Sequence, residues 1–336
     1  MKCGFGKEDM KNFVVITSIN EKTKAICEFE KLNGWHLVIV GDKKSKPIES
    51  NRNLTFLSIQ DQQDLTFSLP QKLPFNHYTR KNVGYLYSIL QGAEFIYDTD
   101  DDNFPYPDWG FDKFCCHSQA QSISKYVNAY QHFTDENIWP RGFPLEFIAH
   151  KKNELTVATS KEVEIGVWQG LADLDPDVDA IYRLVHGAKQ IRFDKNIPIY
   201  LGKGSYCPFN SQNTLWNKKA FPLLYLPSTV SFRFTDILRG YVAQRLIWEE
   251  DLHLGFCGAT VFQERNQHSL IQDFRDEIEC YLGVQEIVEL MDNMIFSEGL
   301  SDNLLQLYQG LLECGFVKKQ EIQRLEAWLD DYNGAV

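Results

Sequence analysis

The stretch FIYDTDDDNF, residues 95–104, holds the side chains best suited to chemistry in this sequence. Four of five consecutive positions are acidic, namely Asp98, Asp100, Asp101 and Asp102, and they follow an apolar run. The stretch contains no basic residue, so the carboxylates repel one another unless a cation offsets the repulsion. Mg²⁺ and Mn²⁺ suit this role, because such ions take one or two carboxylates and complete their shell with water and phosphate oxygens.

Alternation along the chain directs two of these acids to one site. In an extended Asp-x-Asp segment alternate side chains point the same way, so Asp100 and Asp102 are expected to face a common metal ion. A metal at this place would act as a Lewis acid that neutralises a diphosphate leaving group. The competing interpretation is a solvated acidic loop. The position of the run at the end of a buried strand favours the metal site.

The elements that precede the aspartates alternate between strand and helix. Apolar, β-branched runs predict strands at residues 13–19, 36–42 and 55–59 and before the aspartates, and helical spacing predicts helices at 23–35 and 78–93. This alternation is typical of a parallel, doubly wound sheet, which binds ligands beyond the carboxyl ends of its strands. Thr17, Ser18, Asp42 and the aspartates all fall at those ends, so we expect them to converge.

Two basic residues, Arg80 and Lys81, lie near the start of the helix expected at 78–93. Helix N-termini favour anions, so these cations could hold a phosphate group of the ligand. A solvated helix end is the alternative interpretation of the same pair.

Composition narrows the class of protein. The 336 residues are 43% hydrophobic, which is enough for a sizeable core, and the net charge of -12 argues against a nucleic acid or an anionic membrane surface as partner. No run approaches the roughly 20 apolar residues of a membrane span, and no signal peptide is evident. The eight cysteines lack metal-type spacing, which favours a reduced, cytoplasmic protein.

After about residue 130 the regular alternation of strand and helix patterns ends. Residues 130–235 are expected to form irregular strands and loops, and residues 234–249 a helix. From about residue 281 the pattern is helical to the end. We therefore predict a catalytic domain at 1–280 and a helical extension at 281–336, whose apolar faces pack on that domain or on a second copy of it in a homo-oligomer.

Four stretches of the sequence resemble a known family. They are YTRKNVGYLYSILQGAEFIYDTDDDN, WPRGFPLE, VDAIYRL and FRFTDILRGYVAQRLIW, the last continuing to VFQERNQHS. They resemble the STELLO glycosyltransferases and, more distantly, the reversibly glycosylated polypeptides, which are UDP-arabinopyranose mutases. The resemblance covers roughly residues 13–275. It implies a GT-A fold, an α/β architecture in which a Rossmann-like sheet binds a nucleotide sugar beside an Asp-x-Asp metal site.

The resemblance implies roles for the aspartates and the first strand ends. Asp100 and Asp101 would lie near the ribose and the donor sugar, and Asp102 would bind Mn²⁺ or Mg²⁺ that bridges the diphosphate. Thr17 and Asp42 would line the nucleoside pocket, where Asp42 would accept a hydrogen bond from a base N–H.

Further residues are implied by the other stretches. Arg80 would face the pocket from its helix. Late in the domain, His268 would complete the metal shell and Arg265 would contact the diphosphate, although a lone surface histidine is the alternative for His268. The loop YCPFNSQNTLW would grip a sugar with Asn210 and Asn213 as donors.

Arg141 and Asp236 separate two kinds of activity. Arg141 falls on the arginine that the mutase-like relatives carry in VRGYPFS, where it is linked to autoglycosylation. Those relatives have a second arginine shortly after, whereas this sequence continues with LEFIAH. A salt bridge under a loop is the structural alternative for Arg141. Asp236 would be either a helix N-cap or a general base for an acceptor hydroxyl, and Arg233 would pair with it or with a phosphate.

The sequence thus predicts a glycosyltransferase that moves a sugar from a nucleoside diphosphate donor, a UDP-sugar, to a glycan, lipid or protein acceptor. A UDP-sugar mutase is the second enzymatic hypothesis. A non-catalytic scaffold that binds a nucleotide sugar is the alternative from another class, and the intact aspartate cluster argues against it. The plant relatives are Golgi membrane proteins, and the lack of an anchor in this sequence leads us to expect a cytoplasmic protein.

Overall fold

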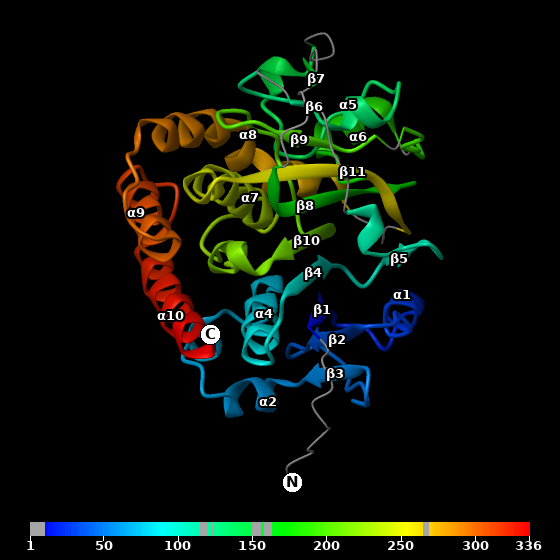
Figure 1. The fold of residues 1–336 in the computed structure, drawn as a ribbon, viewed down its shortest axis with the longest axis vertical. Helices are drawn as coiled ribbons and strands as arrows, with labels where there is room; N and C mark the ends of the chain where they lie inside the picture. The colour runs from blue at the N-terminus through cyan, green and yellow to red at the C-terminus, as the bar shows by residue number, and fades with distance from the viewer. Residues whose placement is uncertain are drawn as a thin grey trace.

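A mixed sheet of nine strands lies at the centre of the molecule (Figure 1). The computed structural model describes residues 11–114, 120–121, 124–149, 156–157, 163–187, 189–195, 197–264 and 269–336. Helices pack on both faces of this sheet. The predicted α/β fold with a mixed sheet and helical flanks, consistent with a GT-A-like architecture, is confirmed.

The first four strands of the sheet are parallel. In spatial order they are β3 (Leu54–Leu57), β2 (Trp35–Val40), β1 (Asn12–Thr17) and β4 (Phe95–Thr99). Their carboxyl ends therefore share one edge, as the sequence predicted. Along β1, Val14 and Ile16 face the core that contains Phe29, whereas Phe13 and Val15 face the core that contains Val83.

The second half of the sheet mixes directions. It continues with β10 (Asn213–Asn217), β8 (Glu164–Asp173), β11 (Leu252–Gln263) and β5 (Asn103–Pro105), and β9 (Ile199–Leu201) also pairs with β11. β10 runs antiparallel to β4 and pairs Asn213 with Thr99. The chain that enters β10 is thereby brought to the edge where β4 ends. A separate pair joins β6 (Ala120–Gln121) to β7 (Thr156–Val157).

Helices occupy the connections and the C-terminal third. The α-helices are α1 (Lys24–Phe29), α2 (Ile59–Asp64), α3 (Leu69–Lys72), α4 (Lys81–Leu90), α5 (Tyr130–Phe133), α6 (Ala180–His186), α7 (Thr235–Ile247), α8 (Leu270–Asn293), α9 (Leu300–Glu313) and α10 (Lys319–Ala335). The 3₁₀ turns are η1 (Tyr78–Arg80), η2 (Phe111–Lys113), η3 (Leu145–Phe147), η4 (Lys218–Leu224) and η5 (Trp248–Glu250). None of the helices in the described ranges combines the length and the hydrophobicity that crossing a bilayer requires.

Two glycines allow the helices that position the site to approach closely. A Cβ atom at Gly84 in α4 would lie 2.6 Å from side-chain carbons of Val15 and Val40. A Cβ atom at Gly240 in α7 would lie 2.5 Å from the carbonyl oxygen of Phe209. Helix α4 thus lies directly against the sheet, and α7 lies directly against the loop before β10. A larger side chain at either glycine would push its helix outward.

The predicted helical extension, residues 281–336 and called the tail below, belongs to the same hydrophobic core as the sheet. Helix α8 begins at Leu270, so the boundary predicted at 280/281 falls inside this helix. Helices α9 and α10 run along one side of the molecule and contact α7, α4 and α3 (Figure 1). Leu304, Leu311 and Trp328 are buried within the cluster that also contains strand residues such as Val15.

Candidate functional site

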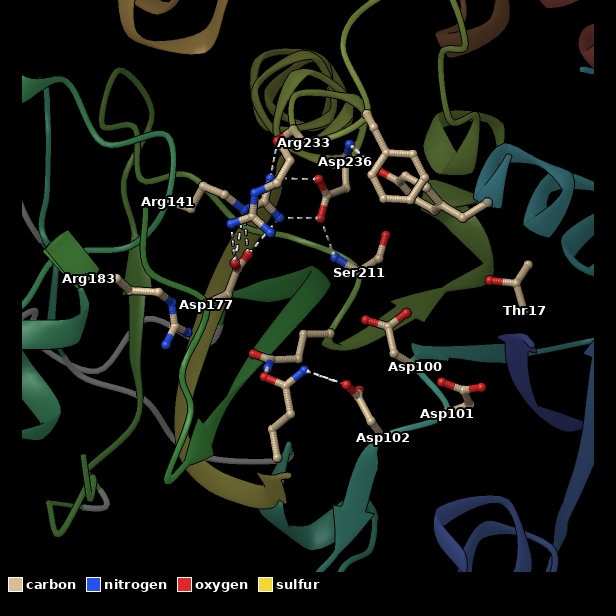
Figure 2. A pocket seen from close by; sticks show the side chains of 14 residues that line it. Thr17, Asp100, Asp101, Asp102, Arg141, Asp177, Arg183, Ser211, Arg233 and Asp236 are labelled. Atoms are coloured by element: carbon tan, nitrogen blue, oxygen red, sulfur yellow. Dashed lines mark hydrogen bonds and ion pairs between the residues drawn. The ribbon is translucent and has the colours of Figure 1, made fainter. Parts of the chain in front are cut away.

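A cavity of about 290 Å³ opens at the edge where β1 and β4 end. Its lining comes from several distant segments (Figure 2). The lining residues are Thr17, Tyr78, Asp100, Asp101, Asp102, Arg141, Asp177, Arg183, Ser211, Gln212, Phe232, Arg233, Asp236 and Gln263. Figure 2 shows the three aspartates after β4 on one side and a group of arginines and acids on the other.

The three aspartates are held by neighbouring polar side chains. Asp101 accepts hydrogen bonds from the Ser18 hydroxyl at 2.5 Å and from the Asn20 amide at 3.0 Å. The Gln263 amide donates to both oxygens of Asp102, at 3.1 and 3.2 Å. The loop after β4 is therefore tied to the end of β1 and to the end of β11, which fixes where its carboxylates point.

Asp98 has a different function from the other three acids. It is fully buried and forms ion pairs with Lys81 Nζ at 2.8 Å and with Arg239 Nη1 at 2.9 Å. Lys81 also contacts an oxygen of Asp100 at 3.1 Å. A buried charge is tolerated only when it is paired and hydrogen-bonded, and Asp98 pairs with one cation from α4 and one from α7, which holds both helices against β4.

The carboxyl of Asp100 has a raised pKa. Partial desolvation raises the pKa of its carboxyl, Lys81 opposes this rise, and repulsion from Asp102 and Asp98 adds to it, so that the pKa reaches about 7. The side chain remains 41% exposed and is thus within reach of a ligand. A cation placed between Asp100 and Asp102 would relieve the repulsion between them.

Arg141 lies across the cavity and joins two carboxylates. Its Nη2 lies 2.7 Å from Asp177 Oδ2 and 2.9 Å from Asp236 Oδ2. Its Nη1 donates to Asp236 Oδ1 at 3.0 Å, and its Nε donates to Asp177 Oδ1 at 2.9 Å. Burial alone would lower the pKa of Arg141, but the two carboxylates raise it well above its ordinary value. The guanidinium is therefore a permanent cation, locked in place on two sides.

The same contacts set the charge of Asp177. Burial raises the pKa of its carboxyl, but the charge and hydrogen bonds of Arg141 outweigh burial and lower the pKa to about 2, with help from Arg233 and Asn210. A carboxyl with so low a pKa is a weak base. Asp177 thus serves to orient Arg141.

Asp236 is also saturated with donors. Oδ1 accepts from Arg141 and from the backbone N–H of Ile237, and Oδ2 accepts from Arg141 and from the backbone N–H of Ser211. An ionised carboxylate offers about four lone-pair positions, and these four contacts fill them. In this state Asp236 fixes Arg141, the start of α7 and the loop before β10.

Two further arginines complete this side of the cavity. Arg233 Nε donates to Glu277 in α8 at 2.6 Å. Arg183 donates to Asp175 at 2.8 Å, while its buried Nε has no partner among the residues that the structure describes. Each of these guanidinium groups therefore has an acidic partner that holds it at the cavity wall.

Comparisons with known proteins find sequences similar to this chain among glycosyltransferases. The family model for STELLO glycosyltransferases matches residues 233–335, from Arg233 through α7 and the tail helices. Two curated proteins of Arabidopsis thaliana, named probable glycosyltransferase STELLO1 and probable glycosyltransferase STELLO2, are each 29% identical to the chain over 95% of its length. The chain is similar to the STELLO glycosyltransferases. It spans 44% of each relative, less than half of their length. The resemblance inferred from the sequence is confirmed.

Thr17 and Ser18 lie beside the aspartates, as the sequence predicted, whereas Asp42 does not line the cavity. Thr17 lines the cavity, and Ser18 supports Asp101. Asp42 follows β2, and its carboxylate accepts from the backbone N–H groups of Lys43 and His77. Asp42 lies outside the cavity lining, and its contact with a nucleobase stays a prediction.

Arg80 and Lys81 lie elsewhere than predicted, because neither side chain is free at the helix start to hold a phosphate. Arg80 is buried away from the cavity, where it donates to the Gln62 side chain at 2.8 and 2.5 Å and to the Pro70 carbonyl. The expectation that Arg80 faces the pocket is wrong, because α2 and α3 supply its acceptors. Lys81 likewise points inward to Asp98, so neither cation forms a solvated helix end.

The loop before β10 also differs from expectation. The amide of Asn210 donates to Asp177, the amide of Asn213 donates to Leu171 and Thr260, and neither residue lines the cavity. Ser211 and Gln212 line the cavity instead. The alternative of Asp236 as an N-cap is wrong as well, because Phe234 is the cap residue of α7.

Two predicted site residues, one for the diphosphate and one for the metal, fall outside the described part of the chain. Arg265 and His268 lie outside the described residues, and their roles stay predictions. Among the residues that are described, no group of three or more His, Cys, Asp or Glu side chains is arranged to hold a metal ion. Any metal bound by the described part of the chain would therefore rely on one or two carboxylates and on oxygens from the ligand.

Several lining residues were missed by sequence reasoning. Asp177 could have been found, because it falls just before VDAIYRL and lies in the acid-rich run DLDPDVD. Arg183 lies within VDAIYRL itself. Gln263, Tyr78 and Phe232 carry no signal of their own, since a glutamine or an aromatic residue occurs in many environments.

Proposed function

We propose that this chain is a metal-dependent glycosyltransferase that moves a sugar from a nucleoside diphosphate sugar, a UDP-sugar, to an acceptor. The observation that carries the proposal is the group of three carboxylates at the end of β4, facing a cavity at the carboxyl edge of the parallel strands. The similarity to proteins named as probable glycosyltransferases supports the reaction class.

The charge of the cavity supports a metal requirement. Five lining side chains are carboxylates and three are guanidinium groups, so the lining is acidic as a whole. The arginines already pair with Asp177, Asp236, Glu277 and Asp175. A diphosphate would meet net repulsion in such a cavity unless a divalent cation entered with it.

The acids present fit that cation. Asp100 and Asp102 offer carboxylate oxygens, the ligands that Mg²⁺ and Mn²⁺ prefer. The raised pKa of Asp100 comes first from desolvation and then from repulsion by Asp102 and Asp98, and a cation would relieve that repulsion. When bound, the metal would neutralise charge on the departing diphosphate. Gln263 would keep Asp102 oriented, and Ser18 would keep Asp101 oriented towards the ribose and sugar.

The contacts of Arg141 weigh against the mutase hypothesis. A glycosylated arginine must first present a nitrogen with an available electron pair. In Arg141 the pKa is raised, and its nitrogens donate to Asp177 and Asp236. The guanidinium is thus held as a buried cation, and the salt bridge considered as its structural alternative describes it well.

The first prediction concerns the metal site. Asp102→Asn should abolish Mn²⁺-dependent binding of UDP-sugars, because a neutral amide loses the charge that attracts the cation, while the fold stays intact. Isothermal titration calorimetry with UDP-glucose and UDP-galactose, with and without Mn²⁺, measures this. Asp108→Asn is the matched control, since Asp108 is 69% exposed and pairs only with Lys113 among its described contacts. Equal donor affinity in the Asp102 variant and the parent would show that the metal assignment is wrong.

A further inference from the structure

We propose that Phe232, braced edge to face by Tyr78, is a stacking platform for a saccharide ring, and that the acceptor of this enzyme is therefore a glycan. This inference rests on the proposed function and names the class of its second substrate. The platform lies on the rim of the cavity, beside the start of α7.

Phe232 combines exposure with a place in the cavity wall. Its side chain is 52% exposed although it lines the cavity. The Tyr78 ring meets it edge to face, with ring centroids 4.7 Å apart, and the His77 ring lies 5.4 Å away. An exposed aromatic surface at the mouth of a polar cavity is a feature of ligand-binding grooves.

The backbone around Phe232 is anchored on both sides. The Ser231 N–H donates to Glu279 at 2.8 Å and its hydroxyl to the Asp276 carbonyl, while Arg233 donates to Glu277. All three acceptors belong to α8. The loop that carries Phe232 is thus fixed, and the ring is presented to solvent at little further entropic cost on binding.

The chemistry of the platform suits a sugar. The face of an aromatic ring carries partial negative charge and attracts the polarised C–H groups on the apolar face of a pyranose. The Ser211 hydroxyl and the side-chain oxygen of Gln212 lie in the same lining and can meet sugar hydroxyls, whereas the amide N–H groups of Gln212 already donate to Asp175 and Gln263. This combination of one apolar face and a few polar groups is the usual composition of a small-molecule site.

The position of the platform favours the acceptor over the donor. The Tyr78 hydroxyl accepts from the backbone N–H of Asp236 at 3.0 Å, so the ring pair adjoins α7. Figure 2 shows Asp236 across the cavity from Asp101 and Asp102, the side proposed for the donor. A nucleobase is the competing occupant, because the backbone N–H of His77 also donates to Asp42 at 3.1 Å.

The test uses saturation-transfer NMR on the full chain with diamagnetic Mg²⁺ and UDP present. The probes are methyl β-glucopyranoside, methyl β-galactopyranoside and methyl α-mannopyranoside. Phe232→Ala should weaken binding of the responding saccharide about tenfold, the upper range expected for one aromatic stacking contact. Phe232→Tyr should retain it, since the ring face remains. Phe274→Ala is the control, because Phe274 is a 37% exposed phenylalanine outside the cavity lining.

The outcomes separate this inference from the proposed function. UDP affinity, measured by calorimetry, should be the same in the parent and in Phe232→Ala. A loss of UDP affinity in that variant would assign the platform to the nucleobase and overturn the inference. It is equally overturned if no probe binds the parent with UDP in place, or if Phe232→Ala binds the probe unchanged. Failure of the parent to bind UDP at all would instead remove the proposed function, and this inference with it.

Discussion

Arg141 joins two acids that the sequence separates widely, Asp177 and Asp236. Removing one partner of a buried charge pair leaves the other charge without compensation, which costs more than the pair itself contributes. The functional role first considered for Asp236 was that of a general base. Its four occupied lone pairs favour an anchoring role, in which it fixes Arg141 and the N–H of Ser211.

Asp236→Asn distinguishes these two roles. As an anchor, Asp236 loses one charge-assisted bond to Arg141 on substitution, because an amide nitrogen then faces a guanidinium N–H. Stability should fall by about 1.5–3 kcal/mol, measured by urea denaturation. If Asp236 also acts as a general base, the substitution would in addition lower transfer by about 10²–10⁴. Asp112→Asn, a substitution of an exposed acid in η2, is the control.

Single residues also show how far the sequence could lead. The aspartates at the end of β4 were found because charge follows an apolar strand, and the meeting of Thr17 and Ser18 with them follows from parallel strands. The burial of Asp98 was not foreseeable, because its partners Lys81 and Arg239 come from two other elements. Arg80 was misplaced for the same reason, since Gln62 lies in a separate helix.

At the scale of elements, the direction of each strand decides which of its flanking residues lie at the cavity. The strands β1, β2 and β4 are predictable from local patterns, and their shared edge follows from the crossover rule. The insertion of β10 between β4 and β8 is a long-range pairing that no local pattern encodes. It is this antiparallel strand that brings Ser211 and Gln212 to the cavity.

Helix α10 depends on a buried carboxylate for its attachment. Glu321 is fully buried and accepts from the Tyr225 hydroxyl and from the backbone N–H groups of Ser228 and Thr229. These donors all belong to the loop that follows η4, so Glu321 links α10 to the part of the chain before the tail. A buried donor that loses its acceptor costs the full desolvation penalty.

Glu321→Leu should therefore destabilise the protein strongly. We expect a loss of about 1–3 kcal/mol for each donor that water cannot reach after the substitution. Guanidinium denaturation followed by circular dichroism measures the loss. Glu326→Leu on the exposed side of the same helix is the matched control and should change stability little. If both variants unfold at the same denaturant concentration, Glu321 does not anchor the tail.

At the scale of the whole molecule, one core extends from β1 to α10. The sequence predicted that the apolar faces of the tail pack on the catalytic domain or on a second copy, and within this chain they pack on α7, α4 and α3. The division into domains at 280/281 stays a prediction. Helix α8 continues through residue 280 and also supplies Glu277 to Arg233, so it contacts the site.

The last prediction follows from this shared core. A chain that ends at Glu298 lacks α9 and α10 and exposes the surfaces that Leu304, Leu311 and Trp328 cover. Each such buried side chain contributes about 1.5–3 kcal/mol, so the loss of the whole layer is comparable to the net stability of a typical domain, about 5–15 kcal/mol. We therefore expect the shortened chain to aggregate or to melt far below the parent in a thermal scan. Deletion of residues 333–336 alone, which are mostly exposed, is the control and should melt like the parent. A chain ending at Glu298 that stays monomeric and melts with the parent would mean that the sheet domain is complete without its tail.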